Sequence, residues 1–146
     1  MTASADALER LRHELDHPPF HAVLRPEPVS VDLDAGTVVI RLPYQPIFGR
    51  AAGSPEVHGG VIATLIDMAG HAAVAVQIQR MAPTIDLRID FLRPAPAADL
   101  FATARTLKLG RAVSRVDIDI CGADGKLVAT GRGAFSSLAP STEGAP

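Results

Sequence analysis

The chain has 146 residues, of which 47% are hydrophobic, and a formal net charge of −2. This length and apolar content suffice for one domain with its own core, and the balanced charge gives no support for nucleic-acid binding. A single cysteine, Cys121, excludes an intrachain disulfide framework. The first residues do not have the pattern of a signal peptide, so we expect a cytoplasmic protein.

The spacing of apolar residues predicts the secondary structure along the chain. Residues 4–15 have the pattern of an amphipathic helix with Ser4 as its N-cap, and His17-Pro18-Pro19 would end it. A tight turn at 34–36 joins two runs in which apolar and polar residues alternate. A loop rich in Gly and Pro follows at 43–57, and a long helix is predicted at 59–79. Strands are predicted at 29–33, 37–42, 84–92, 99–108, 112–121 and 127–136.

The order of these elements predicts an α+β fold, in which an antiparallel sheet of about six strands wraps around one long central helix. No repeat and no change of composition divides the chain. We therefore expect a single domain over residues 1–139, followed by a disordered tail at 140–146.

The long helix is apolar except for a thin polar stripe that contains Asp67. An ionised carboxylate in apolar surroundings costs on the order of several kcal/mol unless it is paired, so Asp67 is a candidate catalytic residue. It would act as a general base on water or as a nucleophile, and both roles stay open, as does a structural carboxylate. Thr64 and His71 lie on the same face, where His71 is either a bonding partner of Asp67 or a core residue. Asp67 and His71 also argue against a membrane span.

A pair of glycines, Gly59 and Gly60, stands at the start of this helix. The pair leaves the first backbone N–H groups open, as an oxyanion site requires, and we expect Gly59 to be the donor. The alternative is that the glycines only allow a tight turn. Gly59 and Asp67 are eight residues, or about 12 Å, apart along one helix. An oxyanion donor and a base must both lie about 3 Å from the reacting group. The spacing therefore predicts a homodimer in which Gly59 of one chain faces Asp67 of the other, and we expect two dimers to form a tetramer.

The segment from Val57 to Asp67 resembles the motif of hotdog-fold acyl-CoA thioesterases of the phenylacetic-acid-pathway (PaaI-like) type. That motif has His-Gly-Gly, then small and aliphatic residues, and an Asp nine positions after the His, which is the spacing of His58 and Asp67. Similarity extends over about residues 20–136, with shorter matches at 43–46, 89–95, 108–111, 124–129 and 131–135. The resemblance implies a hotdog fold and hydrolysis of an acyl-CoA to a carboxylic acid and free CoA, without a cofactor.

The resemblance also implies roles for individual residues. The family often has a Ser or Thr two residues before an Asp in the strand after the helix, where the hydroxyl holds the attacking water. Thr84 stands two residues before Asp86 and fits this pattern, although a strand-start Thr is the alternative. His58 would orient the loop or lie with Gly60 beside the thioester. Many relatives carry an Asn six residues before the His, where this chain has Ala52.

Three cations are candidates for contacts with the CoA portion, because guanidinium and ammonium groups suit phosphates. They are Arg93, Lys108 and Arg111. Lys108 and Arg111 flank a predicted turn, and the alternative to a CoA contact there is an ordinary solvated turn. The chain has no ligand-spaced set of His and Cys, so we expect no metal. The predicted partners are the acyl-CoA substrate and further copies of the chain, with neither nucleic acid nor membrane.

Two other functions stay open. A non-catalytic acyl-CoA-binding protein could keep the same fold, although retention of Asp67 speaks against it and the missing Asn speaks for it. A hotdog dehydratase or hydratase pairs an Asp with a catalytic His a few residues on, and the spacing of Asp67 and His71 is only superficially similar.

Overall fold

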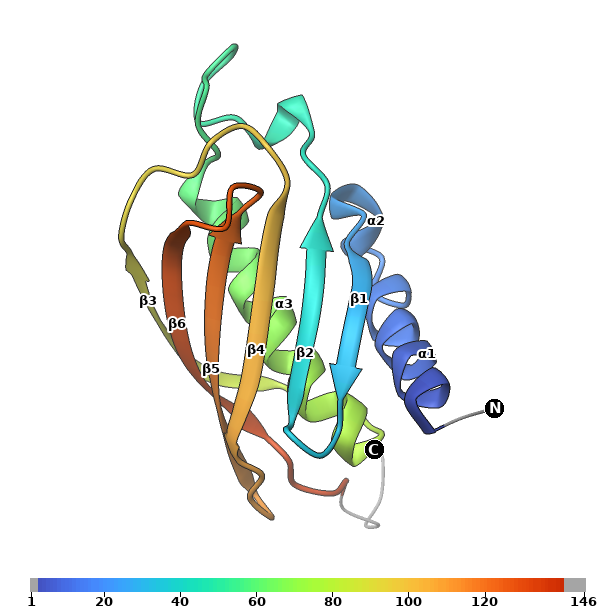
Figure 1. Ribbon diagram of the computed structural model, residues 1–146. Helices are drawn as coiled ribbons and strands as arrows, with labels where there is room; N and C mark the ends of the chain where they lie inside the picture. The colour runs from blue at the N-terminus through green and yellow to red at the C-terminus, as the bar shows by residue number, and fades with distance from the viewer. Residues whose placement is uncertain (1–2, 141–146) are drawn as a thin grey trace, which may run out of the picture.

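The computed structural model describes residues 3–140 (Figure 1). The tail predicted at 140–146 lies outside the described residues except for Pro140. In chain order the elements are α1 (Ala3–Asp16), α2 (His21–Leu24), β1 (Glu27–Asp32), β2 (Thr37–Leu42), the 3-10 helix η1 (Pro46–Phe48), α3 (Gly59–Ile78), β3 (Thr84–Phe91), β4 (Leu100–Lys108), β5 (Val113–Gly122) and β6 (Leu127–Ser136).

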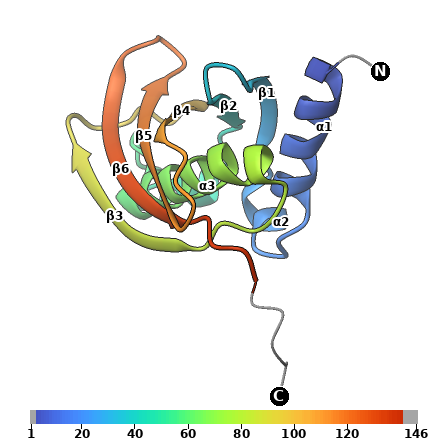
Figure 2. The ribbon, with the colours of Figure 1, turned by 90° about the horizontal axis from the view of Figure 1, so that it is seen from below.

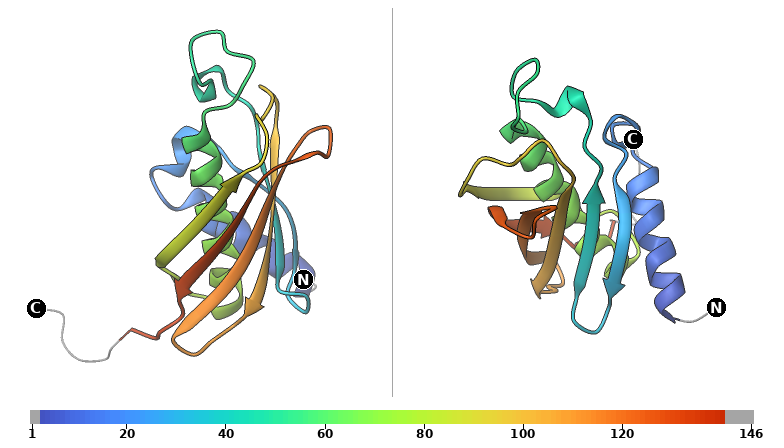
Figure 3. Two further views of the ribbon diagram at one scale, coloured as in Figure 1. Left: turned by 90° about the vertical axis from the view of Figure 1, so that its left-hand side faces the viewer. Right: turned by 45° about the horizontal axis from the view of Figure 1, so that its top comes forward.

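The six strands form one sheet in the order β1-β2-β4-β5-β6-β3, and every neighbouring pair is antiparallel. The sheet curves around α3, as the view from below shows (Figure 2). Strand β1 forms one edge of the sheet and is flanked by α1 (Figure 3). Strand β3 forms the other edge, and most of its residues are exposed. The sheet therefore has one covered edge and one open edge.

Helix α3 packs so closely on the sheet that small residues are needed at the contact. A Cβ atom at Gly70 would overlap the ring of Phe135, and one at Gly131 would overlap Ile66. By length and apolar composition α3 could cross a membrane, but most of this helix is buried inside the protein. Packing against the sheet accounts for the apolar composition of this helix.

The α+β class and the sheet of six antiparallel strands around one helix are confirmed, with strand ends displaced by at most two residues. Ser4 is not the N-cap of α1, because the helix already includes Ala3. The spacing of apolar residues did not predict α2 or η1. Both are too short to form on propensity alone, and α2 is held instead by tertiary hydrogen bonds from Gln45 Nε2 to the carbonyls of Val23, at 3.0 Å, and Leu24, at 3.1 Å.

Candidate active site

The N-terminus of α3 is capped by a histidine. His58 has an extended backbone, with φ −63° and ψ 134°, and its Nδ1 accepts a hydrogen bond of 2.8 Å from the Gly60 N–H. A neutral His58 therefore carries its proton on Nε2. The His58 N–H donates in turn to the Phe48 carbonyl at 2.7 Å. These bonds fix the first turn of α3 relative to η1, so that His58 orients the loop.

The two glycine N–H groups differ in availability. The Gly60 N–H is already bound to His58, whereas the Gly59 N–H donates to no acceptor within residues 3–140. Gly59 is the first residue of α3, where the partial positive charge of the helix dipole is greatest. The Gly59 N–H is therefore the free donor at this end of the helix, and Gly60 contributes space instead.

Asp67 lies two turns into α3, and the residue is half-buried. Its Oδ1 accepts a hydrogen bond of 2.6 Å from the hydroxyl of Thr84, the first residue of β3. Thr84 is the only hydrogen-bond partner of this carboxylate in the described part of the chain. One carboxylate oxygen is thus held while the other is free for water or substrate. Thr64, one turn earlier, donates its hydroxyl to the Gly60 carbonyl at 2.9 Å, as a Thr inside a helix commonly does.

His71 does not bind Asp67, so that reading of the sequence was wrong. Its Nδ1 lies 3.0 Å from the Ala82 carbonyl and its Nε2 lies 3.2 Å from Glu14 Oε2. The Ala82 carbonyl and an ionised Glu14 both accept hydrogen bonds, so a His71 with protons on both ring nitrogens satisfies both contacts. Burial lowers the pKa of His71, but the hydrogen bond to Glu14 and the Ala82 carbonyl outweigh it and raise the pKa. His71 contacts Glu14 because α1 packs against α3. Residue spacing within α3 alone does not reveal this contact.

The basic hollow, as we name it, lies beside Gly59 and has a volume of about 390 Å³. Arg93 lines it, as a contact for CoA would require, together with Arg50, Glu56 and Phe91. Arg50 and Glu56, which both line this hollow, form an ion pair. The sequence pattern did not single out Arg50, because only the folded loop brings it to the start of α3.

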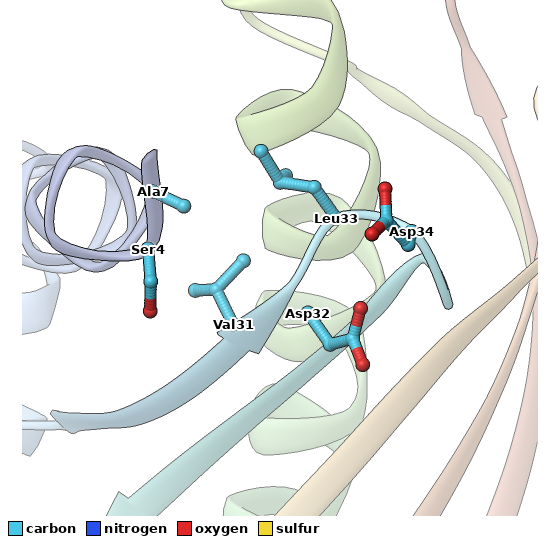
Figure 4. Close-up of a pocket in the computed structure, with 6 residues that line it drawn as sticks. All are labelled: Ser4, Ala7, Val31, Asp32, Leu33 and Asp34. Carbon is cyan, nitrogen blue, oxygen red and sulfur yellow. The ribbon is translucent and has the colours of Figure 1, made fainter. Parts of the chain in front are cut away.

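Lys108 and Arg111 lie elsewhere in the protomer. They flank the turn between β4 and β5, at the far end of β4 from the basic hollow. A strand of this length spans about 27 Å, so within one protomer these two cations do not meet Gly59. A hollow of about 410 Å³ between α1 and β1 is also remote from this site (Figure 4). It is lined by Ser4, Ala7, Val31, Asp32, Leu33 and Asp34.

Comparison with known proteins identifies the family. The family model described as "Thioesterase superfamily" matches residues 56–129, about half of the chain, from the loop before α3 into β6. A candidate esterase of Halobacterium salinarum is 37% identical over 127 residues, covering 79% of this chain and 83% of the relative. The chain belongs to the thioesterase superfamily. Its fold is the hotdog fold of that family, and membership supports thioesterase activity in general.

Solved structures of thioesterases match nearly the whole chain. The PaaI protein of the Escherichia coli phenylacetic acid degradation operon is 27% identical, with a TM-score of 0.81, and the match covers 94% of this chain and 97% of that one. A candidate thioesterase of Ralstonia eutropha, described as related to phenylacetic acid degradation, is 29% identical with a TM-score of 0.78, over 89% of this chain and 98% of that one.

The candidate site departs from the expected pattern at one position. Ala52, where many relatives were expected to carry Asn, is exposed in the loop after η1. Ser54 and Glu56, which follow Ala52 in the same loop, are engaged locally, because the Ser54 hydroxyl accepts from the Glu56 N–H at 3.2 Å and Glu56 pairs with Arg50. The described residues therefore supply two polar groups at Asp67 and Thr84 and one free N–H at Gly59.

Proposed function

We propose that this thioesterase hydrolyses acyl-CoA, giving a carboxylic acid and free CoA, at active sites shared by the two chains of a homodimer. The observation that carries the proposal is the hydrogen bond from Thr84 to Asp67. Asp67 lies on α3, the same helix that presents the free Gly59 N–H. A carboxylate and a separate oxyanion donor are the groups that hydrolysis of a thioester needs.

Each residue has one task in the proposed reaction. The Gly59 N–H binds the thioester oxygen and stabilises the negative charge that develops on it. Asp67 either removes a proton from the attacking water or attacks the carbonyl itself to form an anhydride that water then opens. In both routes the carbon–sulfur bond breaks and CoA leaves as the thiolate, which takes up a proton. Thr84 holds Asp67 in place, and its hydroxyl oxygen can still accept a hydrogen bond from the water.

Two features of the protomer support a shared site. Gly59 and Asp67 lie about 12 Å apart along α3, so one helix cannot bring both to a single carbonyl. Strand β3 is an uncovered edge of eight residues, and Ile85 and Phe91 on it are 55% and 56% exposed. Unpaired edges of this kind favour pairing with another chain. A two-fold axis beside β3 would place Gly59 of one chain near the partner's Asp67, and we propose that two such dimers form a tetramer.

In the bound substrate, the CoA portion would extend from the reacting carbonyl across the basic hollow. Arg50 and Arg93 are its two cations, next to Gly59. Arg93 can bind a phosphate, and Arg50 can do so with the N–H groups that its pair with Glu56 leaves free. Lys108 and Arg111 can contribute only from another chain, because of their distance from Gly59 in one protomer. The proposed reaction needs no metal or other cofactor. We propose that the protein is cytoplasmic and binds neither nucleic acid nor membranes.

The proposal is tested by a panel of aromatic and aliphatic acyl-CoA thioesters, assayed for release of free thiol with wild type and Asp67→Ala. We expect hydrolysis by wild type and loss of turnover in the variant. The second candidate, a non-catalytic acyl-CoA-binding protein, is favoured by Ala52 and predicts binding of acyl-CoA by both proteins without thiol release. Sedimentation at assay concentration tests the dimer, since an active monomer would contradict a shared site.

A further inference from the structure

Two hydrogen bonds hold the start of β3 against the middle of α3. Thr84 Oγ1 donates to Asp67 Oδ1 at 2.6 Å, and His71 Nδ1 lies 3.0 Å from the Ala82 carbonyl oxygen. The segment before β3 therefore runs antiparallel to the helix. Four helical residues rise about 6 Å and two extended residues span about 6.6 Å, so the two bonds fit side by side.

The pairing of β3 with β6 does not by itself fix the position of Thr84. The register of the two strands shifts between Thr84 and Asp86, at the very start of β3. A bulge of this kind disrupts the ladder locally and leaves the extra residue without a partner. The carbonyl just before Thr84 accepts from the Ser136 N–H at 2.7 Å and ties the segment to β6. The bond between His71 and Ala82 sets the position of the same segment relative to α3.

His71 is itself held from α1. Its Nε2 lies 3.2 Å from Glu14 Oε2, and the two side chains are 21% and 23% exposed. With protons on both ring nitrogens, His71 donates to Glu14 and to the Ala82 carbonyl at once. Because the imidazole ring is rigid and planar, the bond to Glu14 also directs Nδ1 toward Ala82. Helix α1 thus supports, through His71, the segment that brings Thr84 to Asp67.

We infer that His71 is a positioning residue for the proposed reaction. By holding the segment before β3 one turn from Asp67, it keeps the Thr84 hydroxyl on the carboxylate, and Glu14 orients its ring for this task. The inference rests on the proposed function, because it assigns to His71 an effect on turnover at Asp67. In this role His71 does not contact the substrate, so it affects kcat and leaves KM unchanged.

Two substitutions of His71 separate its two hydrogen bonds. The amide nitrogen of Asn is as many bonds from Cα as Nδ1 of His, and that of Gln is as many as Nε2. His71→Asn can therefore keep the bond to Ala82, whereas His71→Gln keeps only the bond to Glu14. In steady-state assays on acyl-CoA we expect kcat per folded molecule to stay within about twofold of wild type in the Asn variant and to fall about three- to tenfold in the Gln variant. A residue that only docked α1 would give the opposite order.

A double variant tests whether His71 acts through Thr84. In Thr84→Val the hydroxyl that His71 positions is gone, so adding His71→Gln should lower kcat by no more than about twofold further. Arg10→Gln is the matched control, because Arg10 Nη1 also joins α1 to α3, at 3.5 Å from the Val76 carbonyl, in a bond that does not involve the segment before β3. It should leave kcat unchanged. His71→Met, which has no donor, replaces His71→Gln if that variant does not fold.

The outcomes separate this inference from the proposed function. If wild type releases no thiol from any acyl-CoA, the proposed function fails and the inference fails with it. If wild type is active but folded His71→Gln keeps its kcat, or the losses in His71→Gln and Thr84→Val add in full, His71 only docks α1 on α3 and the inference is overturned. A loss that appears in KM instead of kcat would also overturn it, because it would place His71 at the substrate.

Discussion

Thr84 Oγ1 donates a hydrogen bond of 2.6 Å to Asp67 Oδ1 and so joins the start of the edge strand β3 to the middle of the buried helix α3. The two residues are 17 positions apart in the chain. The bond holds one carboxylate oxygen and leaves the other free. It also places Asp67 at the open edge of the sheet, where another chain can approach.

Removal of this hydrogen bond should slow turnover. In Thr84→Val the shape is kept but the hydroxyl is lost, and a bond to a charged acceptor contributes about 1.5–3 kcal/mol. We expect kcat to fall roughly ten- to a hundredfold in steady-state assays. Thr84→Ser keeps the hydroxyl and should recover most of the activity. Equal activity in the Val and Ser variants would show that Thr84 is only a strand-start residue.

Asp67→Asn should keep the fold and substrate binding while kcat falls by orders of magnitude. The amide oxygen can still accept the hydrogen bond from Thr84, but the group acts neither as a base nor as an effective nucleophile. Removal of a half-buried charge should leave the melting temperature unchanged or slightly higher. Melting and thioester hydrolysis are measured on one preparation. A variant that melts much lower but keeps full activity per folded molecule would assign Asp67 to the scaffold.

Gly59→Pro should nearly abolish turnover without unfolding α3. Gly59 is the first helical residue, a position where Pro is tolerated, and the extended backbone of His58 suits a following proline. Pro lacks the N–H, and loss of one oxyanion donor costs about a hundredfold or more in kcat. Gly59→Ala is the control, because its Cβ would meet Phe91 at 3.4 Å, an ordinary contact, and the N–H is kept. Wild-type activity in a folded Pro variant would place the oxyanion site elsewhere.

The pair of Glu14 and His71 should make stability depend on pH. The hydrogen bond from His71 holds the pKa of Glu14 below its ordinary value of 4.5. Burial lowers the pKa of His71, but its bonds to Glu14 and Ala82 raise it above its ordinary value of 6.5. Stabilisation by Glu14 is lost as pH falls through its lowered pKa, and that by His71 is lost as pH rises through its raised pKa.

The pair should therefore contribute most between pH 4.5 and 6.5. The difference in melting temperature between wild type and Glu14→Gln should be largest in that window and should shrink at higher pH. Glu9→Gln, on the same helix in an exposed pair with Arg12, should shift melting little at any pH. A difference for Glu14→Gln that does not vary with pH would contradict the assignment of charges to this pair.

The sequence predicted those features that depend on local periodicity and on one motif. The alternation of apolar residues located all six strands, and the apolar run with its glycine pair located α3 and the residues of the candidate site. The partner of His71 could not be predicted, because spacing within a helix says nothing of α1 packing beside it. The contact between α2 and η1 was missed for the same reason, since hydrogen bonds from Gln45 and His58 bring these short segments together.

The central claim, an active site divided between two chains, is tested most directly by mixing two inactive variants. Asp67→Asn and Gly59→Pro are co-expressed in equal amounts, and hydrolysis of acyl-CoA is compared with that of each variant alone. In a mixed dimer one site carries both substitutions and the other carries neither. Since half of the dimers are mixed, the preparation should recover about a quarter of the wild-type activity. Activity no greater than that of the separate variants, in a preparation shown to contain mixed dimers, would contradict a shared site.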